Sequence, residues 1–371
     1  MRLLIWQWGR RGAGPRYAAE LAAGFRALPD MHAVLSLSAQ AEILQGGARP
    51  VCDLPFPTYD SLAGAARRAM AGPFLAAQLA QRLRKLRLDA AICAMPAPLD
   101  LVMSGALHRS GVPYAVVVHD ADRHPGESWP LQFTLQRRLV RQADAVIALT
   151  GHVATRLRHQ GLGLCQPLIM ATHPPFAFGP VPPPPLSHGG PLRLLCFGRL
   201  LPYKGLDLLA DALGLVGARP DLQVRVAGSG PESATLQRLR RLPGVSVENR
   251  WVPEDEVGPL LAWADALVLS HREASQSGVA AAAIAARRWL VATRVGGISE
   301  QLRDEPLARL CDPTAASLAT ALTQLIETPP PIGEAPDPLQ AWRATAAGLG
   351  EALATAFLDR KARPGALPPT F

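Results

Sequence analysis

The stretch RLLCFGRLLPYKGLD, residues 193–207, decides the fold. Its first part, residues 193–197, is apolar after Arg193 and predicts a buried strand, and Gly198 then permits a tight turn. Arg199 and Lys204 follow on the loop that leads into a helical pattern. Doubly wound sheets bind ligands at the carboxyl ends of their strands, and a helix N-terminus attracts anions. The two cations therefore predict a clamp for a diphosphate in an α/β domain.

Short apolar runs alternate with longer stretches of Ala, Leu and Arg through most of the chain. This pattern is typical of a parallel sheet covered by helices on both faces. We expect strands at residues 3–6, 33–37, 90–93, 114–118 and 145–149, and again at 193–197, 223–227, 246–248, 266–269, 290–293 and 308–311. Helical patterns include residues 17–28, 74–86, 280–286 and 339–358. The predicted fold class is α/β, with two Rossmann-like domains.

Residues 174–190 interrupt this rhythm with seven prolines and a Gly-Gly pair. Consecutive prolines lack N–H donors and favour an extended chain, as in a linker. We therefore expect a division into four parts: an N-terminal domain over 1–175, a linker over 176–190, a second domain over 191–335 and a helical segment over 336–371.

The composition excludes a disordered chain, since 49% of the 371 residues are apolar. The five cysteines are scattered without metal-ligand spacing, which predicts buried free thiols in a reducing compartment. They are Cys52, Cys93, Cys165, Cys196 and Cys311. No apolar stretch reaches the roughly 20 residues of a membrane helix, and residues 1–6 predict a first strand instead of a signal peptide. We expect a cytoplasmic protein.

The net charge of +8 belongs to the first half of the chain. Residues 1–180 hold 19 basic and 11 acidic side chains, whereas residues 181–371 hold 19 of each. A positive field attracts anionic partners, such as a membrane surface, nucleic acid or a phosphorylated acceptor. The alternative is ordinary solvated charge in an arginine-rich chain. No basic motif with interleaved aromatic residues supports nucleic acid.

The helical pattern over residues 74–86 has an apolar side and a basic side. The side chains expected near the apolar face are Phe74, Leu79, Leu83 and Leu86, and those opposite are Arg82, Arg84, Lys85 and Arg87. Such a helix can lie on anionic lipid. A solvated charged face is again the alternative.

A second segment, HREASQSGV at residues 271–279, follows the strand expected at 266–269. Small residues at a helix start leave backbone N–H groups open to phosphate oxygens, so we expect diphosphate contacts at Ser277, Gly278 and Val279. Glu273 is a candidate to accept hydrogen bonds from sugar hydroxyls. The alternative role for Glu273 is a capping carboxylate.

These segments resemble the retaining glycosyltransferases of family four. The family's G-R-x-x-x-x-K-G loop matches residues 198–205, and its V-A-T-x-x-G-G-x-x-E segment matches residues 291–300. A glycine turn at residues 226–232 is also similar, and the match is good from about residue 190 to 305. The resemblance implies the GT-B fold, in which two Rossmann-like domains with parallel sheets face a central cleft. It also implies that Arg199 and Lys204 of the G-R-x-x-x-x-K-G loop hold the donor pyrophosphate.

The sequence departs from the family at Ala281. The family's Glu-x7-Glu pattern places a second carboxylate there, on the ribose hydroxyls, and this chain keeps only Glu273. In the GT-B mechanism Arg, Lys and a helix N-terminus balance the leaving diphosphate, so we expect neither a metal nor a cofactor. We interpret the chain as a divergent subgroup of the family.

The first half offers a histidine and a glycine-containing loop. His119 ends the strand expected at 114–118, where the family carries a histidine that faces donor sugar and acceptor, and we expect it to be catalytic together with Glu273. A structural histidine is the alternative. Gly12, Gly14 and Arg16 follow the first strand and are candidates for an acceptor or donor loop. Tyr17 breaks the G-x-G-x-x-G fingerprint, which argues against a nicotinamide-dependent oxidoreductase.

The sequence thus predicts a hexosyltransferase that uses a nucleoside diphosphate sugar with retention of the anomeric configuration. The resemblance implies an N-terminal acceptor domain, a C-terminal donor domain and a terminal helical segment that packs back on the first. We expect a lipid-linked or otherwise anionic acceptor, or a polysaccharide precursor, at the inner face of a membrane. The alternatives are a non-catalytic sugar-nucleotide-binding protein and a sugar-nucleotide epimerase of the same fold.

Overall fold

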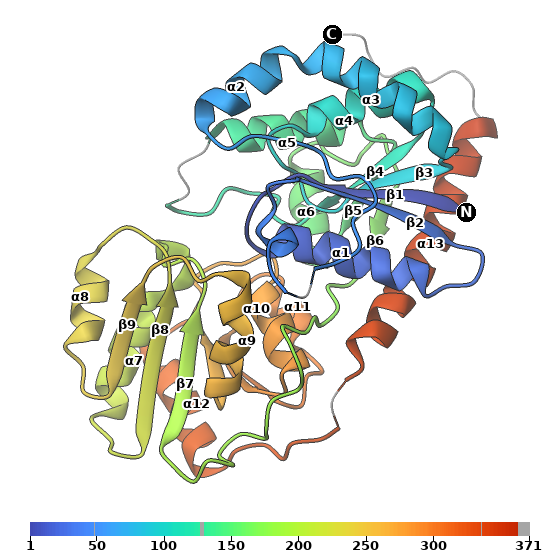
Figure 1. Cartoon of the computed structure of the whole chain (residues 1–371). Coiled ribbons are helices and arrows are strands. Elements are labelled where there is room, and N and C mark those ends of the chain that lie inside the picture. The colour runs from blue at the N-terminus through green and yellow to red at the C-terminus, as the bar shows by residue number, and fades with distance from the viewer. Residues whose placement is uncertain (48, 127–129, 335, 363–371) are drawn as a thin grey trace. The chain divides into compact units, whose positions relative to one another are not determined.

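The computed structural model describes residues 1–47, 49–126, 130–334 and 336–362. These residues form two compact units, coloured along the chain in Figure 1. Unit 1 contains the described residues of 1–122, 130–172 and 339–362, and unit 2 contains those of 123–126 and 173–338. The short segment 123–126, predicted as part of the first domain, thus belongs with the second unit.

Unit 1 is built on a six-stranded parallel sheet with the order β2-β1-β3-β4-β5-β6. Its strands are β1 Arg2–Gln7, β2 His32–Leu37, β3 Ala90–Cys93, β4 Tyr114–Val118, β5 Ala145–Ala148 and β6 Leu168–Met170. The chain order reverses between β1 and β3, so the loops after these strands lie at a topological switch point.

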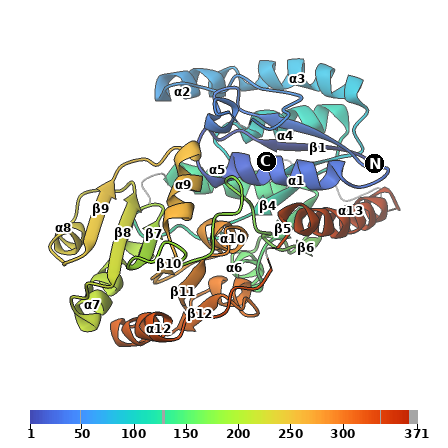
Figure 2. The ribbon, with the colours of Figure 1, turned by 60° about the horizontal axis from the view of Figure 1, so that its bottom comes forward.

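Helices cover both faces of this sheet. They are α1 Ala13–Arg26, α2 Leu62–Met70, α3 Gly72–Leu86, α4 Asp100–Ser110, α5 Pro130–Gln142, α6 Gly151–His159 and α13 Pro338–Ala362, with a 3-10 turn at Glu42–Leu44. Figures 1 and 2 show α3 and α4 side by side on one face and α1 on the other. The buried Trp342 of α13 lies edge-on to Tyr17 of α1, with ring centroids 5.0 Å apart. Gly24 permits this approach, since a Cβ there would come within 2.6 Å of the Trp342 carbonyl oxygen.

Unit 2 repeats the architecture with the strand order β12-β11-β10-β7-β8-β9, again all parallel. Its strands are β7 Leu192–Phe197, β8 Leu222–Gly228, β9 Val245–Asn249, β10 Ala266–Leu269, β11 Trp289–Thr293 and β12 Ala308–Cys311. Its helices are α7 Leu206–Val216, α8 Ala234–Arg240, α9 Glu254–Trp263, α10 Gly278–Ala285, α11 Ile298–Gln301 and α12 Ala315–Glu327, with a 3-10 turn at Pro202–Lys204. Here the switch point lies between β7 and β10. The predicted α/β fold with two parallel sheets is confirmed.

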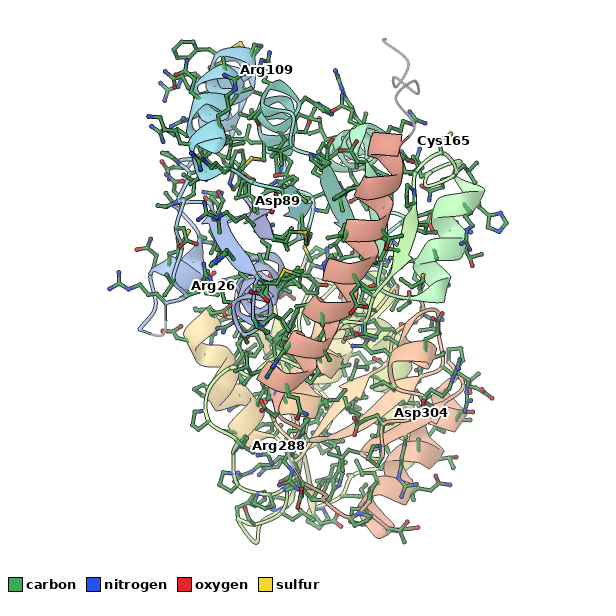
Figure 3. The ribbon with its side chains drawn as sticks, turned by 90° about the vertical axis from the view of Figure 1, so that its right-hand side faces the viewer. Arg26, Asp89, Arg109, Cys165, Arg288 and Asp304 are labelled. Atoms are coloured by element: carbon green, nitrogen blue, oxygen red, sulfur yellow. The ribbon has the colours of Figure 1, made fainter. Side chains whose placement is uncertain are left out.

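The proline-rich segment before β7 is anchored along unit 2. Asp265, which is 1% exposed, accepts hydrogen bonds from the backbone N–H of Leu186 (2.6 Å) and from His188 Nε2 (3.0 Å). Arg288 donates to the carbonyl oxygen of Pro183 over 2.6 Å, and Figure 3 labels its side chain. A buried carboxylate and a buried guanidinium thus hold residues 183–188, which the composition alone predicts as a plain extended spacer.

Two details differ from the sequence-based expectations. Phe74 is 65% exposed, while Leu79 and Leu83 are buried in the core, because a five-residue step carries Phe74 around α3 to the opposite side. The five cysteines are free, and Cys93, Cys196 and Cys311 are buried as expected, but Cys165 is exposed (Figure 3). Among the described residues, no helix is both long and apolar enough to cross a bilayer.

Candidate active site

The loop after β7 takes the shape that its glycines allow. Gly198 has a φ of +120° and lies against Gly228, where a Cβ would come within 1.7 Å of the Gly198 carbonyl oxygen. Gly205 begins α7 with a φ of +61°, and a Cβ there would lie 2.0 Å from the carbonyl oxygen of Ser270. Only glycine fits such close backbone contacts. The loop is thereby packed against the end of β10, across the switch point.

Lys204 ends the 3-10 turn of this loop and contacts a histidine that follows β10. Its Nζ lies 2.9 Å from Nε2 of His271, which is 3% exposed. Burial, followed by the charge of Lys204, holds the pKa of His271 well below its usual range. The neutral imidazole therefore accepts a hydrogen bond from the ammonium group, and the positive charge of the pair stays on Lys204. His271 was not among the predicted site residues, although it lies two positions after a predicted strand.

Arg199 and Lys204 both lie near the ring of Tyr203. The Arg199 Cζ is 5.4 Å from the ring centroid and the Lys204 Nζ is 5.6 Å from it. Tyr203 itself is buried. The structure therefore brings the two predicted cations to one aromatic side chain, at distances at which the ring's π-face attracts positive charge.

The start of α10 faces the same loop. A Cβ on Gly198 would meet Lys204 Nζ at 3.6 Å and Val279 Cγ2 at 3.8 Å, so these three residues lie together. Ser277 is the N-cap, and its Oγ accepts from the backbone N–H of Ala280 over 3.2 Å. The Ser277 backbone N–H donates to Gln301 Oε1 over 2.8 Å. The Ser277 hydroxyl and backbone N–H are thus already hydrogen-bonded within the protein and shape the start of the helix. Gly278 and Val279 follow in the first turn of α10.

Glu273 lies between β10 and α10 with its side chain 49% exposed. Its Oε1 is 3.4 Å from Nδ1 of His124. The His124 ring stacks on Tyr203, with centroids 4.4 Å apart and planes inclined by 15°. His124 was missed by the sequence analysis because its segment was assigned to the other domain. Ala281, at the position of the family's second carboxylate, is fully buried in α10.

His119, the other predicted catalytic residue, follows β4 in unit 1 and is 5% exposed. Its Nε2 lies 2.9 Å from the carbonyl oxygen of Ala94, which can only accept, so Nε2 carries the hydrogen and Nδ1 is the acceptor. The ring packs edge-on against Tyr17 at 4.7 Å. Burial lowers the pKa of His119 to about 4, which keeps it neutral near pH 7.

The predicted loop of unit 1 follows β1, at the switch point. Gly12 is the N-cap of α1 with a φ of +83°. Gly14 packs on Gln7, whose Nε2 would lie 2.7 Å from a Cβ at that position. Arg16 lies within α1 and pairs with Glu20 one turn later, at 3.3 Å. The Arg16 guanidinium thus takes part in an ion pair on the surface of α1.

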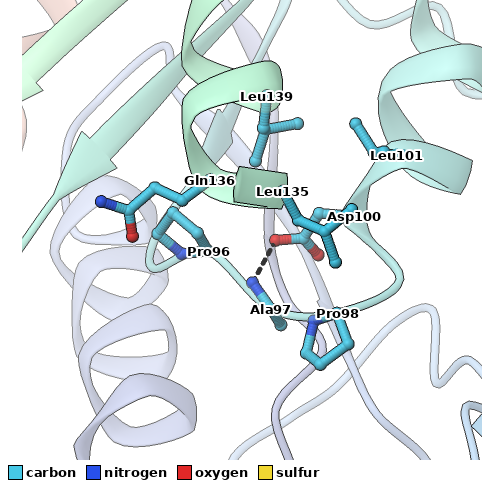
Figure 4. A pocket seen from close by; sticks show the side chains of 8 residues that line it. All are labelled: Pro96, Ala97, Pro98, Asp100, Leu101, Leu135, Gln136 and Leu139. Carbon is cyan, nitrogen blue, oxygen red and sulfur yellow. Dashed lines mark hydrogen bonds between the residues drawn. The ribbon is translucent and has the colours of Figure 1, made fainter. Parts of the chain in front are cut away.

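A small pocket lies beside the carboxyl end of β3 in unit 1 (Figure 4). Its lining is mostly apolar and consists of Pro96, Ala97, Pro98, Asp100, Leu101, Leu135, Gln136 and Leu139. Asp100 accepts from the Ala97 N–H at 2.6 Å and from Trp6 Nε1 at 3.2 Å. Burial raises the pKa of Asp100 to about 7.

Over the part of the chain that the structure describes, no group of three or more His, Cys, Asp or Glu side chains could hold a metal ion.

Two family models match the chain, one in each half. The glycosyl transferase 4-like domain matches residues 12–164, and the glycosyl transferases group 1 model matches residues 191–328. A comparison with curated proteins finds no match.

Several solved structures share the fold over nearly the whole chain. Anabaena HepE, solved with UDP and glucose, has a TM-score of 0.65 and 20% identity over 96% of this chain and 95% of its own. Sucrose-phosphate synthase of Thermosynechococcus elongatus has a TM-score of 0.65 and 15% identity over 97% and 98%. The lipopolysaccharide outer core galactosyltransferase WaaB has a TM-score of 0.60 and 14% identity over 97% and 100%. With both halves matched by transferase models and the two parallel sheets in place, the chain is a family-four-type glycosyltransferase of the GT-B fold.

Proposed function

We propose that the protein transfers a hexosyl group from a nucleoside diphosphate sugar to an acceptor hydroxyl, with anomeric retention. The observation that carries this proposal is the grouping of Arg199, Lys204 and the first turn of α10 at the β7/β10 switch point. Two cations and a helix N-terminus suit the two charges of a leaving diphosphate. HepE, which shares the fold, was solved with UDP and with UDP-glucose, which makes a uridine diphosphate sugar the first donor to test.

In the proposed reaction the bond from the sugar's anomeric carbon to the diphosphate oxygen breaks as the acceptor oxygen attacks from the same face. The leaving phosphate takes the acceptor's proton. Lys204 and Arg199 stabilise the charge that develops on the diphosphate, and Glu273 accepts hydrogen bonds from the sugar hydroxyls. His119 serves the acceptor side, because its neutral Nδ1 can accept a hydrogen bond from a hydroxyl group. Unit 2 is the donor domain in this scheme, and unit 1 is the acceptor domain.

The experiment is a donor screen on the purified chain. The unfolding midpoint is measured with UDP-, GDP- and ADP-glucose, and release of the nucleoside diphosphate is then followed with the stabilising donor and with water as the acceptor of the sugar. The proposal expects one donor to raise the midpoint and to be turned over, and the NMR coupling of the product's anomeric proton to show retention. A chain that binds a donor without turnover would favour the sugar-nucleotide-binding alternative. Epimerised donor formed without an acceptor would favour the epimerase.

The proposed acceptor is anionic or lipid-linked, and α2 with α3 is the proposed membrane contact. Residues 61–88 contain six basic side chains and no acidic one. Met70 at the end of α2 and Phe74 at the start of α3 are 78% and 65% exposed. Exposed apolar side chains beside basic ones suit the interface of an anionic bilayer, where each basic side chain contributes about 1 kcal/mol. A peripheral place at the inner face of the membrane follows from this proposal.

Vesicle co-sedimentation tests the membrane contact. The chain should bind vesicles of phosphatidylcholine with phosphatidylglycerol at low salt, and lose binding as salt rises. Phe74→Ser should weaken binding, while the matched control Leu215→Ser, 64% exposed in unit 2, should not. Neutralising four basic residues within residues 61–88 should act more strongly than neutralising four in unit 2. The first set is Arg67, Arg82, Lys85 and Arg87, and the second is Arg219, Arg238, Arg241 and Arg303. An equal loss of vesicle binding from both sets would reject a membrane contact localised to α2 and α3.

A further inference from the structure

The segment that carries His124 is built into unit 2. Residues 123–126 belong to that unit, although residues 1–122 and 130–172 belong to unit 1. Gly126, with a φ of +91°, lies against Pro202, whose Cδ would be 2.8 Å from a Cβ at that position. His124 is 7% exposed and lies flat on Tyr203. The segment therefore packs on the same 3-10 turn that positions Lys204.

The orientation of the His124 ring points to more than packing. A stacked ring at this position needs no nitrogen, yet Nδ1 is directed at Glu273 Oε1 over 3.4 Å. A carboxylate only accepts hydrogen bonds, so Nδ1 carries the hydrogen of this contact. Among the described residues, His124 is the one hydrogen-bond partner of the Glu273 carboxylate.

A half-exposed glutamate with one partner depends on that partner for its orientation. Glutamate has three rotatable side-chain bonds and pays a large entropy cost when it is held in one rotamer. The hydrogen bond from His124 restricts the Glu273 side chain before any ligand binds, because the His124 ring is itself held by stacking on Tyr203. The hydrogen bond uses Oε1 and leaves Oε2 for a ligand hydroxyl.

We infer that His124 is a positioning residue that fixes Glu273 for the donor sugar, and that it ties this carboxylate to the turn that carries Arg199 and Lys204. This inference rests on the proposed function for the role of Glu273. Tyr203 is the shared support, since it contacts His124 on its ring face and lies within 6 Å of both cations. The stacked pair of His124 and Tyr203 would thus fix the position of the sugar subsite relative to the diphosphate subsite.

Two substitutions separate the ring from its nitrogen. His124→Phe keeps a ring to stack on Tyr203 and removes the N–H. His124→Asn removes the ring and keeps an amide N–H near the position of Nδ1. With UDP-glucose as the probe donor, His124→Phe should lower kcat for UDP release about tenfold, the effect of losing one charge-assisted hydrogen bond, with the donor KM changed less than about twofold. His124→Asn should recover only part of the loss, because it restores an N–H without the ring that stacks on Tyr203.

Further variants test the coupling to Glu273. In a Glu273→Ala background, which removes the acceptor of this contact, His124→Phe should add less than about a twofold further loss, because the two groups act through one contact. An equal kcat for His124→Phe and wild type, or an Asn variant as impaired as the Phe variant, would overturn the inference.

A cycle on the free protein keeps the test independent of the donor. The urea unfolding midpoints of His124→Phe, Glu273→Ala and the double variant are compared with wild type. The inference expects the double variant's shift to be smaller than the two single shifts combined, and additive shifts would overturn it. The unfolding midpoints can show coupling while the wild type turns over none of UDP-, GDP- and ADP-glucose. That result would contradict the proposed function and still support the His124–Glu273 contact.

Discussion

Lys204→Met is the perturbation that isolates the charge of the proposed diphosphate clamp. Methionine keeps most of the apolar stem and removes the ammonium group. In the structure that group lies 2.9 Å from His271, whose lowered pKa makes it a neutral partner, so the contact does not cancel the charge. The substitution therefore removes one unit of positive charge from the loop after β7.

The size of the effect follows from Coulomb's law. Two unit charges about 4 Å apart interact by about 4 kcal/mol at an effective dielectric constant of about 20. Lys204 is half-buried, so partial screening by water brings the expected loss to about 2–4 kcal/mol of transition-state stabilisation. This corresponds to a kcat/KM lowered roughly 30- to 700-fold. The free energy of unfolding should fall by only about 1 kcal/mol, the net value of one hydrogen bond.

The assay is the initial rate of nucleoside diphosphate release at several donor concentrations, with urea unfolding of the same preparation. Arg241→Ala, an exposed cation elsewhere in unit 2, is the matched control and should retain the wild-type rate. A Lys204→Met variant within about threefold of wild type in kcat/KM would refute the clamp. A loss of activity that merely follows a large loss of stability would refute it as well.

Three further predictions concern the sugar and acceptor residues. Glu273→Gln should lower kcat while leaving the affinity for the free nucleoside diphosphate unchanged by titration calorimetry, whereas equal losses would indicate a structural role. His119→Ala should lower turnover and leave nucleoside diphosphate binding intact, because His119 belongs to unit 1, and an unchanged rate in a folded variant would make it structural. Burial lowers the pKa of His119 from 6.5 to about 4, so the unfolded chain binds its proton first and stability should fall as the pH drops through this window, by at most about 3 kcal/mol. His119→Gln should flatten that part of the stability profile in urea titrations between pH 7 and 4, and an unaltered profile would contradict the assignment.

The parallel sheets were predictable because buried strands leave continuous apolar runs. Ala90–Cys93, Tyr114–Val118 and Ala266–Leu269 are fully buried, and their predicted bounds agree with the structure. Strand β6 was missed because it has three residues and is only partly buried. The wrong placement of Phe74 has a similar origin, since Leu79 and Leu83 alone define the buried stripe and nothing local tells which way the first turn of α3 faces.

The grouping of the candidate site residues was predictable only where a motif lies on one continuous segment. Gly198, Arg199 and Lys204 share one loop, so their spacing shows them together. The contacts of Lys204 with His271 and of Glu273 with His124 join segments 67 and 149 residues apart. No local pattern encodes such pairs. Ser277 shows a further limit, because a small residue at a helix start predicts an open N–H, while the structure gives that N–H to Gln301.

Calorimetric titration with nucleotides tests the central claim most directly, since it asks whether unit 2 recognises a diphosphate. UDP, GDP and ADP are compared with the matching monophosphates on the wild-type chain and on the Arg199→Ala/Lys204→Ala double variant. We expect one diphosphate to bind at least about tenfold more tightly than its monophosphate, because it adds a charge-assisted contact, and the double variant to lose this difference. Equal affinity for diphosphate and monophosphate in the wild type, or a preference that survives in the double variant, would contradict it.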